Sequence, residues 1–131
     1  MQSRKRLLIV DDDRDFVEAV SCYLEANGFT VFRAHDGAEG IRLAKLERPD
    51  LILMDIMMSE RTEGFFTIHE IRLDPALKTV PIFVLSSFST RLPDFEIPTK
   101  GGWLAHDMFF AKPVDVVQLL EKIRQRLDKA A

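Results

Sequence analysis

Four short apolar runs recur along the chain, and a charged or hydroxyl-bearing residue follows each of them. The runs are Leu7–Val10, Leu51–Met54, Ile82–Leu85 and Met108–Ala111. Runs of this length without alternating polar positions are typical of strands that are buried on both faces of a parallel sheet. A further β-rich run, Phe29–Arg33, follows Gly28. The predicted strands therefore cover residues 6–10, 29–33, 51–55, 81–85 and 108–111.

Between these runs, apolar residues recur at the three- and four-residue spacing of one helix face. The apolar positions are Phe16, Val20, Tyr23 and Leu24 in the first segment, Ile41, Leu43, Ala44 and Leu46 in the second, Phe65, Ile68 and Ile71 in the third, and Val116, Val117, Leu120, Ile123 and Leu127 in the last. Helix stops follow the first three segments, at Asn27-Gly28, Pro49 and Asp74-Pro75. We expect N-caps at Asp36 and Asp115, where a short polar side chain precedes a helical segment.

Strands and helices thus alternate along the chain. Such alternation is typical of the α/β class, in which right-handed crossovers place helices on both faces of a parallel sheet. One stretch breaks the pattern, because residues 88–106 contain Pro93, Pro98 and Gly101-Gly102. Prolines and paired glycines disfavour a long uninterrupted helix. We therefore expect the fourth helix of the series to be short or replaced by a loop.

Length and composition restrict the protein to a few classes. With 131 residues, 47% of them hydrophobic, the chain has room for one domain with a proper core, and we expect no output domain. The net charge of −3 argues against a nucleic-acid partner, because it leaves no basic stripe for a phosphate backbone. No apolar run is long enough for a signal-peptide core or a membrane span, so we expect a cytoplasmic protein.

Cys22 is the only cysteine of the chain. It cannot form a disulfide within the chain, and it stands among the apolar positions of the first expected helix. We therefore predict a packed thiol at this position rather than a nucleophile.

The residues that follow the apolar runs carry the candidate chemistry. They are Asp11, Asp12 and Asp13 after the first run, Asp55 after the second, Ser86 after the third and Lys112 after the fourth. The carboxyl ends of parallel strands meet at one sheet edge, where α/β proteins bind ligands. Two unit charges about 4 Å apart repel by roughly 4 kcal/mol at an effective dielectric constant of about 20. A cluster of Asp11, Asp12 and Asp55 therefore favours protonation or a bound cation.

The ligands available at this edge indicate which cation to expect. They are hard oxygens without a histidine or cysteine beside them, which favours Mg²⁺ or Mn²⁺ over Zn²⁺. A carboxylate beside such a cation is suited to attack phosphorus, because the cation offsets its repulsion from the phosphoryl oxygens. Asp55 would then become an aspartyl phosphate. Lys112 is suited to pair with one phosphoryl oxygen, and the Ser86 hydroxyl to donate a hydrogen bond to another.

These segments resemble the successive motifs of two-component response regulator receiver domains. The matching segments are Leu7–Asp13, Leu51–Met58, Pro81–Ser87 and Phe109–Pro113, and together they span nearly the whole chain. Each motif alone is weak, but four in order at the ends of the expected strands form a specific signal. The resemblance implies a stand-alone receiver, similar to the chemotaxis receiver, with a flavodoxin-like, doubly wound three-layer fold. It also implies five parallel strands in the order 2-1-3-4-5.

The resemblance further implies a phosphoacceptor and a metal site. Asp55 is expected to accept a phosphoryl group from a histidine kinase or a phosphotransfer protein. Mg²⁺, or Mn²⁺ in its place, is expected to bind Asp11, Asp12, Asp55 and the backbone carbonyl of Met57. The protein would be a signalling switch that dephosphorylates itself rather than an enzyme. It would act through a downstream protein that the sequence does not identify.

A second set of residues is implied to sense the phosphate. Ser86 and Lys112 are expected to contact the phosphoryl group, and Phe109 takes the position of the switch aromatic. A cis peptide bond is implied between Lys112 and Pro113. This leaves Asp13 with a helix-capping role.

The chain also departs from the common receiver pattern. The loop before Gly64 is one residue longer than usual and lacks a proline, and Ser86 replaces the more usual threonine. Residues 88–106 stand where most receivers have a helix, and they resemble a minor receiver group with a proline- and glycine-rich segment and a tryptophan. Phe95 and Trp103 are candidates for a signalling surface in this segment. The alternative, that Trp103 packs over the sheet in place of the missing helix, stays open.

Two other functions are compatible with the sequence. Aspartates at positions 11 to 13 after a strand have the spacing of haloacid-dehalogenase-like phosphatases, in which Asp11 would be the nucleophile. The chain is short for such an enzyme and lacks a clear late acidic pair for the metal. The other alternative is a degenerate receiver that binds its partners unphosphorylated, although the acids, the hydroxyl and the lysine that phosphorylation needs are all present.

Overall fold

The computed structural model describes residues 4–56, 63–86 and 108–129. Its elements are β1 (Arg6–Val10), α1 (Arg14–Ala26), β2 (Thr30–Ala34), α2 (Gly37–Glu47), β3 (Leu51–Asp55), α3 (Glu63–Arg72), a 3₁₀ turn (Pro75–Leu77), β4 (Ile82–Ser86), β5 (Met108–Ala111) and α4 (Val116–Lys129). The alternation confirms the α/β class that the apolar pattern predicts. β1, β3 and β5 have the expected bounds, and β2 and β4 each lie one residue further along the chain.

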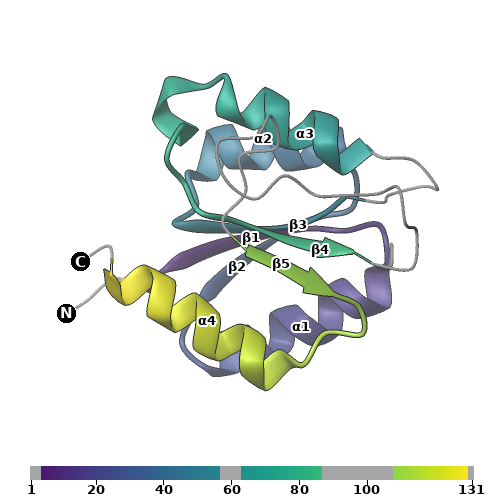
Figure 1. Cartoon of the computed structure of the whole chain (residues 1–131), viewed down its shortest axis with the longest axis vertical. Helices are drawn as coiled ribbons and strands as arrows, with labels where there is room; N and C mark the ends of the chain where they lie inside the picture. The colour runs from purple at the N-terminus through teal and green to yellow at the C-terminus, as the bar shows by residue number, and fades with distance from the viewer. Residues whose placement is uncertain (1–3, 57–62, 87–107, 130–131) are drawn as a thin grey trace.

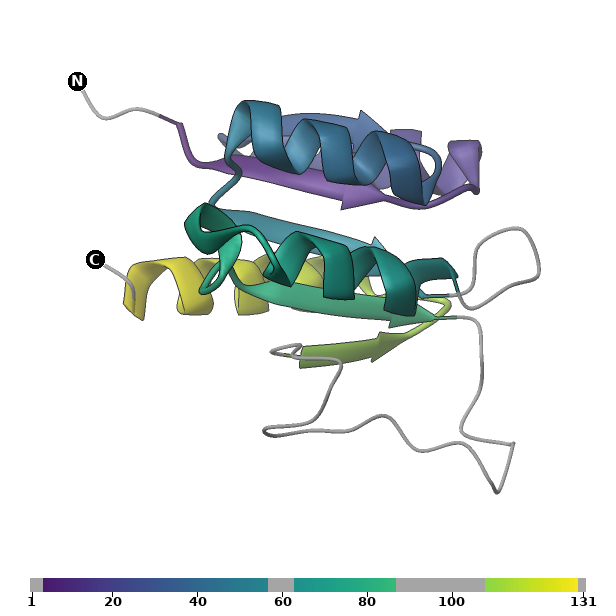
Figure 2. The same cartoon turned by 90° about the horizontal axis from the view of Figure 1, so that it is seen from above.

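The five strands form one parallel sheet in the order β2-β1-β3-β4-β5. Helices α2 and α3 cover one face of this sheet, and α1 and α4 cover the other (Figure 1). Seen from above, the strand arrows point in one direction, so their carboxyl ends share one edge (Figure 2). The arrangement confirms the flavodoxin-like, doubly wound fold and its strand order. The expected shortening of the fourth helix concerns residues 88–106, which lie outside the described residues.

The apolar residues of the central strands are fully buried and supply most of the core. Alternate residues point to opposite faces of a strand, so each strand contributes to both layers. The layer below α2 and α3 contains Leu8, Val10, Ile52, Met54, Ile82 and Val84. The layer below α1 and α4 contains Leu7, Ile9, Leu51, Leu53, Phe83 and Leu85. Each such side chain contributes about 1.5–3 kcal/mol on burial, which explains why the strand positions that face these two layers are apolar.

Aspartate caps determine where three of the helices begin. The side-chain oxygens of Asp13, Asp36 and Asp115 each accept a hydrogen bond from a backbone N–H two or three residues further along, at 2.8 to 3.2 Å. Such caps satisfy N–H groups that have no partner within the helix. The caps expected at Asp36 and Asp115, and the capping role of Asp13, are confirmed. Because Asp13 caps α1, this helix starts directly beside the acids that follow β1.

The prediction of a packed Cys22 thiol is wrong. The buried face of α1 consists of Val17, Val20, Ser21 and Leu24, and Cys22 is exposed. One residue turns an α-helix by about 100°, so Ser21 takes the buried position and Cys22 points away from it. The Cys22 thiol donates a hydrogen bond to Oε1 of Glu18 at 3.4 Å.

Candidate functional site

Three acids gather at the carboxyl edge of the sheet. Val10 of β1 pairs with Met54 of β3, so Asp11, which follows β1, and Asp55, which ends β3, lie at the same level of the edge. One carboxylate oxygen from each of Asp11, Asp12 and Asp55 lies within 4.8 Å of the others. Asp11 is 0% and Asp55 2% exposed, whereas Asp12 is exposed to solvent. The structure thus brings together the three acids that the sequence singles out.

Asp11 is fixed by hydrogen bonds to two other segments. Its backbone N–H donates to the carbonyl of Ala34 at 3.0 Å, which ties it to the end of β2. Its Oδ1 accepts a hydrogen bond from the backbone N–H of Asp13 at 2.9 Å. Nδ1 of His35 lies 3.4 Å from its backbone carbonyl oxygen. Both the backbone and the side chain of Asp11 are therefore held in one orientation.

Lys112 reaches this cluster from the loop after β5. Its Nζ lies 2.6 Å from Oδ2 of Asp11 and 3.6 Å from Oδ2 of Asp55. The peptide bond between Lys112 and Pro113 is cis, as the resemblance implies. Asp11 and Lys112 are 101 residues apart in sequence, so only the parallel sheet brings them into contact. The pair is largely shielded from water, since the Lys112 side chain is 16% exposed.

The environment of Lys112 favours its charged form. Partial burial lowers the pKa of the ammonium, but the hydrogen bond to Asp11 and the negative charges of neighbouring carboxylates, Asp55 among them, outweigh it, so the pKa of Lys112 is raised. Nζ also lies 4.4 Å from the centre of the Phe16 ring. A cation over an aromatic face gains about 0.5–2 kcal/mol. The ammonium is therefore a permanent positive charge at this edge near neutral pH.

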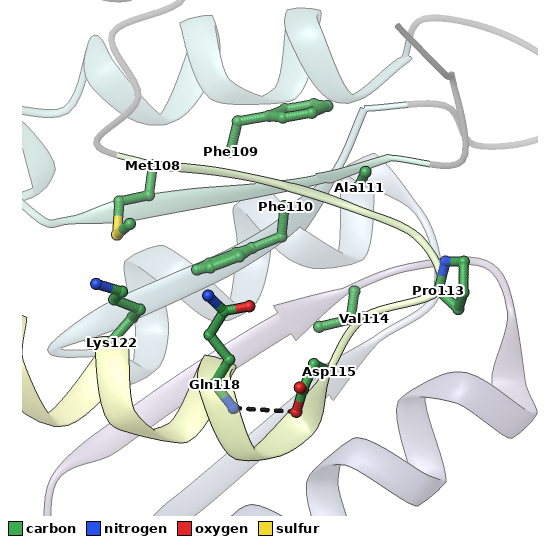
Figure 3. Close-up of a pocket in the computed structure, with 9 residues that line it drawn as sticks. All are labelled: Met108, Phe109, Phe110, Ala111, Pro113, Val114, Asp115, Gln118 and Lys122. Atoms are coloured by element: carbon green, nitrogen blue, oxygen red, sulfur yellow. Dashed lines mark hydrogen bonds between the residues drawn. The ribbon is translucent and has the colours of Figure 1, made fainter.

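Ser86 and Phe109 lie on the two strands beyond β3. Ser86 is the last residue of β4 and pairs with Ala111, so its backbone is at the same edge as Asp55. Phe109 is half-buried, and its ring lies on the side of β5 that packs against the layer below α2 and α3. Figure 3 shows the ring of Phe110 on the opposite side of the strand, toward α4. Met57, Phe95 and Trp103 lie outside the residues that the structure describes.

Two pockets adjoin β5 and the loop after it. One has a volume of about 280 Å³ and lies between β5 and α4, where Met108, Phe110, Gln118 and Lys122 line it (Figure 3). The other has a volume of about 500 Å³ and opens beside the acids; its lining is Asp13, Phe16, Ala19, Val20, Lys112, Pro113, Val114 and Val116. The Lys112 side chain thus forms part of the wall between the buried acids and an open, mainly apolar hollow.

Two residues contact the site although the sequence pattern does not predict that they do. Phe16 fits the apolar face of α1, and only its place in the first turn, three residues after Asp13, hints that it contacts the site. Gly64 is buried at the start of α3 and lies against the peptide that follows Asp55. No local pattern predicts that contact, because it depends on how α3 sits on the sheet.

The donor atoms of the cluster fit a small divalent cation. They are hard carboxylate oxygens on residues that come from two adjacent strand ends, and two of the three side chains are nearly or fully buried. Mg²⁺ and Mn²⁺ prefer such oxygens and retain water ligands, which the exposed Asp12 side of the cluster accommodates. The same geometry makes Asp55 a desolvated carboxylate 3.6 Å from the Lys112 ammonium.

The fold and this edge define a doubly wound α/β protein with an acidic strand-end site. The family model for the response regulator receiver domain matches residues 7–124. The chain belongs to the response regulator receiver domain family of two-component signalling.

The proteins similar to this chain differ in the share of their own length that aligns with it. The DNA-binding dual master transcriptional regulator RpaA of Synechocystis sp. is 34% identical to this chain over 122 residues. These residues are 93% of this chain and 48% of RpaA, so the chain spans about half the length of that relative. The polar-differentiation response regulator DivK of Brucella anthropi is 31% identical over 96% of this chain and 98% of its own length. A CheY-like receiver domain protein from Methanospirillum hungatei is 27% identical with a TM-score of 0.77, covering 97% of this chain and 96% of its own.

None of the helices within residues 4–56, 63–86 and 108–129 combines the length and the apolar character that crossing a membrane requires.

Proposed function

We propose that this protein is a phosphoacceptor, in which Asp55 takes a phosphoryl group from a histidine kinase or a phosphotransfer protein. The observation that carries the proposal is the position of the Asp55 carboxylate. It is 2% exposed, belongs to the cluster with Asp11 and Asp12, and lies 3.6 Å from the Lys112 ammonium. Family membership supports the same residue, because Asp55 lies in one of the four matching motifs.

The proposed transfer is a substitution at phosphorus. A carboxylate oxygen of Asp55 forms a bond to the phosphorus of a phosphohistidine while the P–N bond breaks. The imidazole nitrogen leaves with the electron pair and takes up a proton, and the product is an aspartyl phosphate. Lys112 lies where it offsets negative charge on a phosphoryl oxygen, which favours the transition state electrostatically.

Asp11, Asp12 and Asp55 are the side chains that would hold Mg²⁺ or Mn²⁺, with the backbone carbonyl of Met57 as the further ligand that the resemblance implies. When bound, the cation supplies positive charge that screens the acceptor from the phosphoryl oxygens. The contribution of the chain itself is orientation, because the hydrogen bonds from Asp13 and to Ala34 hold Asp11 in place.

Phosphorylation adds about −1.5 to −2 charges beside Lys112. We infer that Lys112 then shifts part of its pairing from Asp11 to a phosphoryl oxygen, and that the Ser86 hydroxyl donates a hydrogen bond to another oxygen. Ser86 pairs with Ala111 of β5, and Ala111 lies two residues after Phe109. A movement at the end of β4 would therefore be transmitted to the strand that carries the switch aromatic.

The output of this switch would be a changed surface near Ser86, Phe109 and residues 88–106. A downstream protein would bind that surface, with Phe95 and Trp103 as candidate contacts. In this proposal the protein works in the cytoplasm as a self-dephosphorylating switch rather than as an enzyme. Its partners are other proteins, not a nucleic acid or a membrane.

Phosphotransfer from a panel of phosphorylated histidine kinases tests the proposal. We expect label on the wild-type chain in Mg²⁺, none in EDTA and none on Asp55→Asn. An experimental structure of the chain in complex with beryllofluoride then locates the acceptor site. Beryllofluoride at Asp11 would instead support the phosphatase, and a chain that no kinase and no small phosphodonor labels would support a receiver that acts unphosphorylated.

A further inference from the structure

We propose that Gly64 is a positioning residue for the phosphoacceptor. The first turn of α3 rests directly on the backbone that carries Asp55, and a residue without a side chain is what permits this contact. The inference rests on the proposed function, because it concerns where the Asp55 carboxylate stands during phosphoryl transfer.

The space at Gly64 leaves no room for a methyl group. A Cβ built on Gly64 would lie 2.2 Å from the carbonyl oxygen of Asp55 and 2.3 Å from Cα of Ile56. Both are backbone atoms, and both distances are far below van der Waals contact. Gly64 is itself buried, and its N–H donates a hydrogen bond to the carbonyl of Ile56 at 3.3 Å. Helix α3 therefore begins in direct contact with the Asp55–Ile56 peptide.

Backbone conformation is not the reason for a glycine at this position. Among the glycines of the described ranges, only Gly28 has a positive φ, of 97°. Gly64 lies inside α3, where other residues adopt the same dihedral angles without strain. Its missing side chain thus serves the close approach of the helix to the strand end.

The peptide below Gly64 has little freedom to move away. Asp55 pairs with Leu85 of β4, and the N–H of Ile56 donates to the carbonyl of Leu85 at 3.2 Å. The Ile56 side chain is 0% exposed. Because sheet pairing and burial hold this peptide from the other side, an added methyl group would force either α3 outward or the Asp55 carboxylate out of its position.

A displaced Asp55 would lose its relation to the rest of the cluster. Its Oδ2 is 3.6 Å from the Lys112 ammonium, and its other neighbours in the cluster lie within 4.8 Å. A misplacement of about 1 Å costs on the order of a hundredfold in rate when reacting groups must be aligned. We therefore expect Gly64→Ala to slow phosphorylation about tenfold to a hundredfold.

The chain offers two matched glycine controls. Gly28→Ala adds a methyl group where nothing lies within 4 Å, but at a positive φ, so it lowers stability without contacting the site. Gly40→Ala adds a methyl group in a buried position of α2, where the Cβ would lie 2.9 Å from two side-chain methyl groups of Val10 rather than from backbone. Together they separate loss of stability and crowding in the core from displacement of the acceptor.

The experiment measures phosphorylation by phosphoramidate in Mg²⁺, with the rate followed against donor concentration for the folded fraction of each variant. We expect Gly64→Ala to lower the maximal rate while the donor concentration at half-maximal rate changes less than twofold. Gly28→Ala and Gly40→Ala are expected to stay within about threefold of wild type. A maximal rate of Gly64→Ala equal to that of the two controls overturns the inference.

Hydrogen exchange of the wild-type chain covers the case in which Gly64→Ala does not fold. The inference requires the Gly64 amide to be protected from exchange, because its N–H donates to the carbonyl of Ile56 and is buried against the Asp55–Ile56 peptide. Exchange of Gly64 as fast as in an unfolded peptide overturns it. If the wild type is not phosphorylated while the Gly64 amide is protected, the proposed function fails and the contact itself stands.

Discussion

At the scale of single residues, Lys112 brings a positive charge to the acidic cluster, because its ammonium pairs with Asp11 and lies 3.6 Å from Asp55. Asp11 has no exposed surface, so removing its partner leaves a buried carboxylate without its charged neighbour. A hydrogen bond to a charged group contributes about 1.5–3 kcal/mol. We therefore predict that Lys112→Met lowers the free energy of unfolding by about this amount in EDTA, as measured by urea denaturation.

The exposed Lys45 provides the control for this substitution. Lys45→Met is expected to change the free energy of unfolding by less than about 0.5 kcal/mol, as surface substitutions usually do. Since the pKa of Lys112 is raised in the folded protein, its contribution is complete below the ordinary lysine pKa and is lost as the pH rises through the folded-state value. Equal losses for the two variants at neutral pH would contradict the assigned ion pair.

Cys22 allows a second test with a single side chain. Its pKa is raised by the hydrogen bond to Glu18, by partial desolvation and by the charge of the same carboxylate. A raised pKa leaves less thiolate at a given pH, and the thiolate is the reactive form. We predict that iodoacetamide alkylates Cys22 with a pH midpoint above that of a free cysteine peptide, and that Glu18→Gln lowers this midpoint. Glu121→Gln, the same change on the exposed face of α4, should leave the midpoint where it is.

At the scale of elements, the connection from α3 to β4 depends on Arg72. One of its guanidinium nitrogens, Nη1, donates to the carbonyls of Leu77, Lys78 and Val80 at 3.0, 3.2 and 2.7 Å. These carbonyls span the 3₁₀ turn and the approach to β4, so one side chain fixes the path of the chain between the two elements. Hydrogen bonds from a charged donor are stronger than neutral ones.

We predict that Arg72→Gln lowers the free energy of unfolding by about 1.5–3 kcal/mol, because a glutamine cannot reach the same carbonyls with a charged donor. Thermal unfolding followed by circular dichroism measures the change. Arg124→Gln is the comparison, since Arg124 makes exposed contacts with Asn27 within the part of the chain that the structure describes. A loss for Arg72→Gln no larger than that for Arg124→Gln would show that the turn holds without the guanidinium.

The bounds of the strands and the orientation of the helices can be predicted from the sequence to different degrees. The apolar runs suffice for β1, β3 and β5, because four consecutive apolar residues without alternating polar positions leave a continuous signal. β2 and β4 are displaced by one residue, because their ends are determined by pairing with neighbours, as for Ser86 with Ala111. The error at Cys22 has a similar origin: adjacent polar and apolar residues on α1 leave the rotation of the helix undetermined within one position.

The candidate site, too, is predictable from the sequence only in part. The gathering of Asp11, Asp12 and Asp55 is predictable, because strand order alone brings strand ends to one edge. The ring of Phe16 below Lys112 and the contact of Gly64 with Asp55 are not, since they depend on the packing of a helix against a strand end far away in sequence. Sequence patterns specify which residues meet at an edge, and tertiary packing determines how each is held.

For the whole molecule, the site links segments that are otherwise distant in the chain. Asp11, Asp55 and Lys112 come from three different strand ends, so their relative positions exist only while the sheet is intact. A ligand that binds this arrangement but not the unfolded chain must stabilise the whole fold. Mg²⁺ should therefore raise the unfolding temperature, and its removal by EDTA should lower it again.

Replacement of one ligand tests whether this stabilisation comes from the acidic cluster. Asp12 is the exposed member, so Asp12→Asn removes a carboxylate from the site with little change to the core. At a Mg²⁺ concentration about a hundred times the dissociation constant, wild type gains about 2.7 kcal/mol. We predict that Asp12→Asn loses most of this gain, while its stability in EDTA is equal to or above that of wild type, because repulsion among the carboxylates is reduced.

Asp74→Asn is the matched control for that experiment. Asp74 caps the 3₁₀ turn at the opposite end of α3, and asparagine is an equally good cap, so the same charge is removed away from the cluster. This variant should keep the full response to Mg²⁺ in calorimetry. An equal response of Asp12→Asn and Asp74→Asn would mean that the ion acts on the protein as a general salt. A response retained only by Asp74→Asn would tie the stability of the whole sheet to the edge where Asp55 is proposed to accept phosphate.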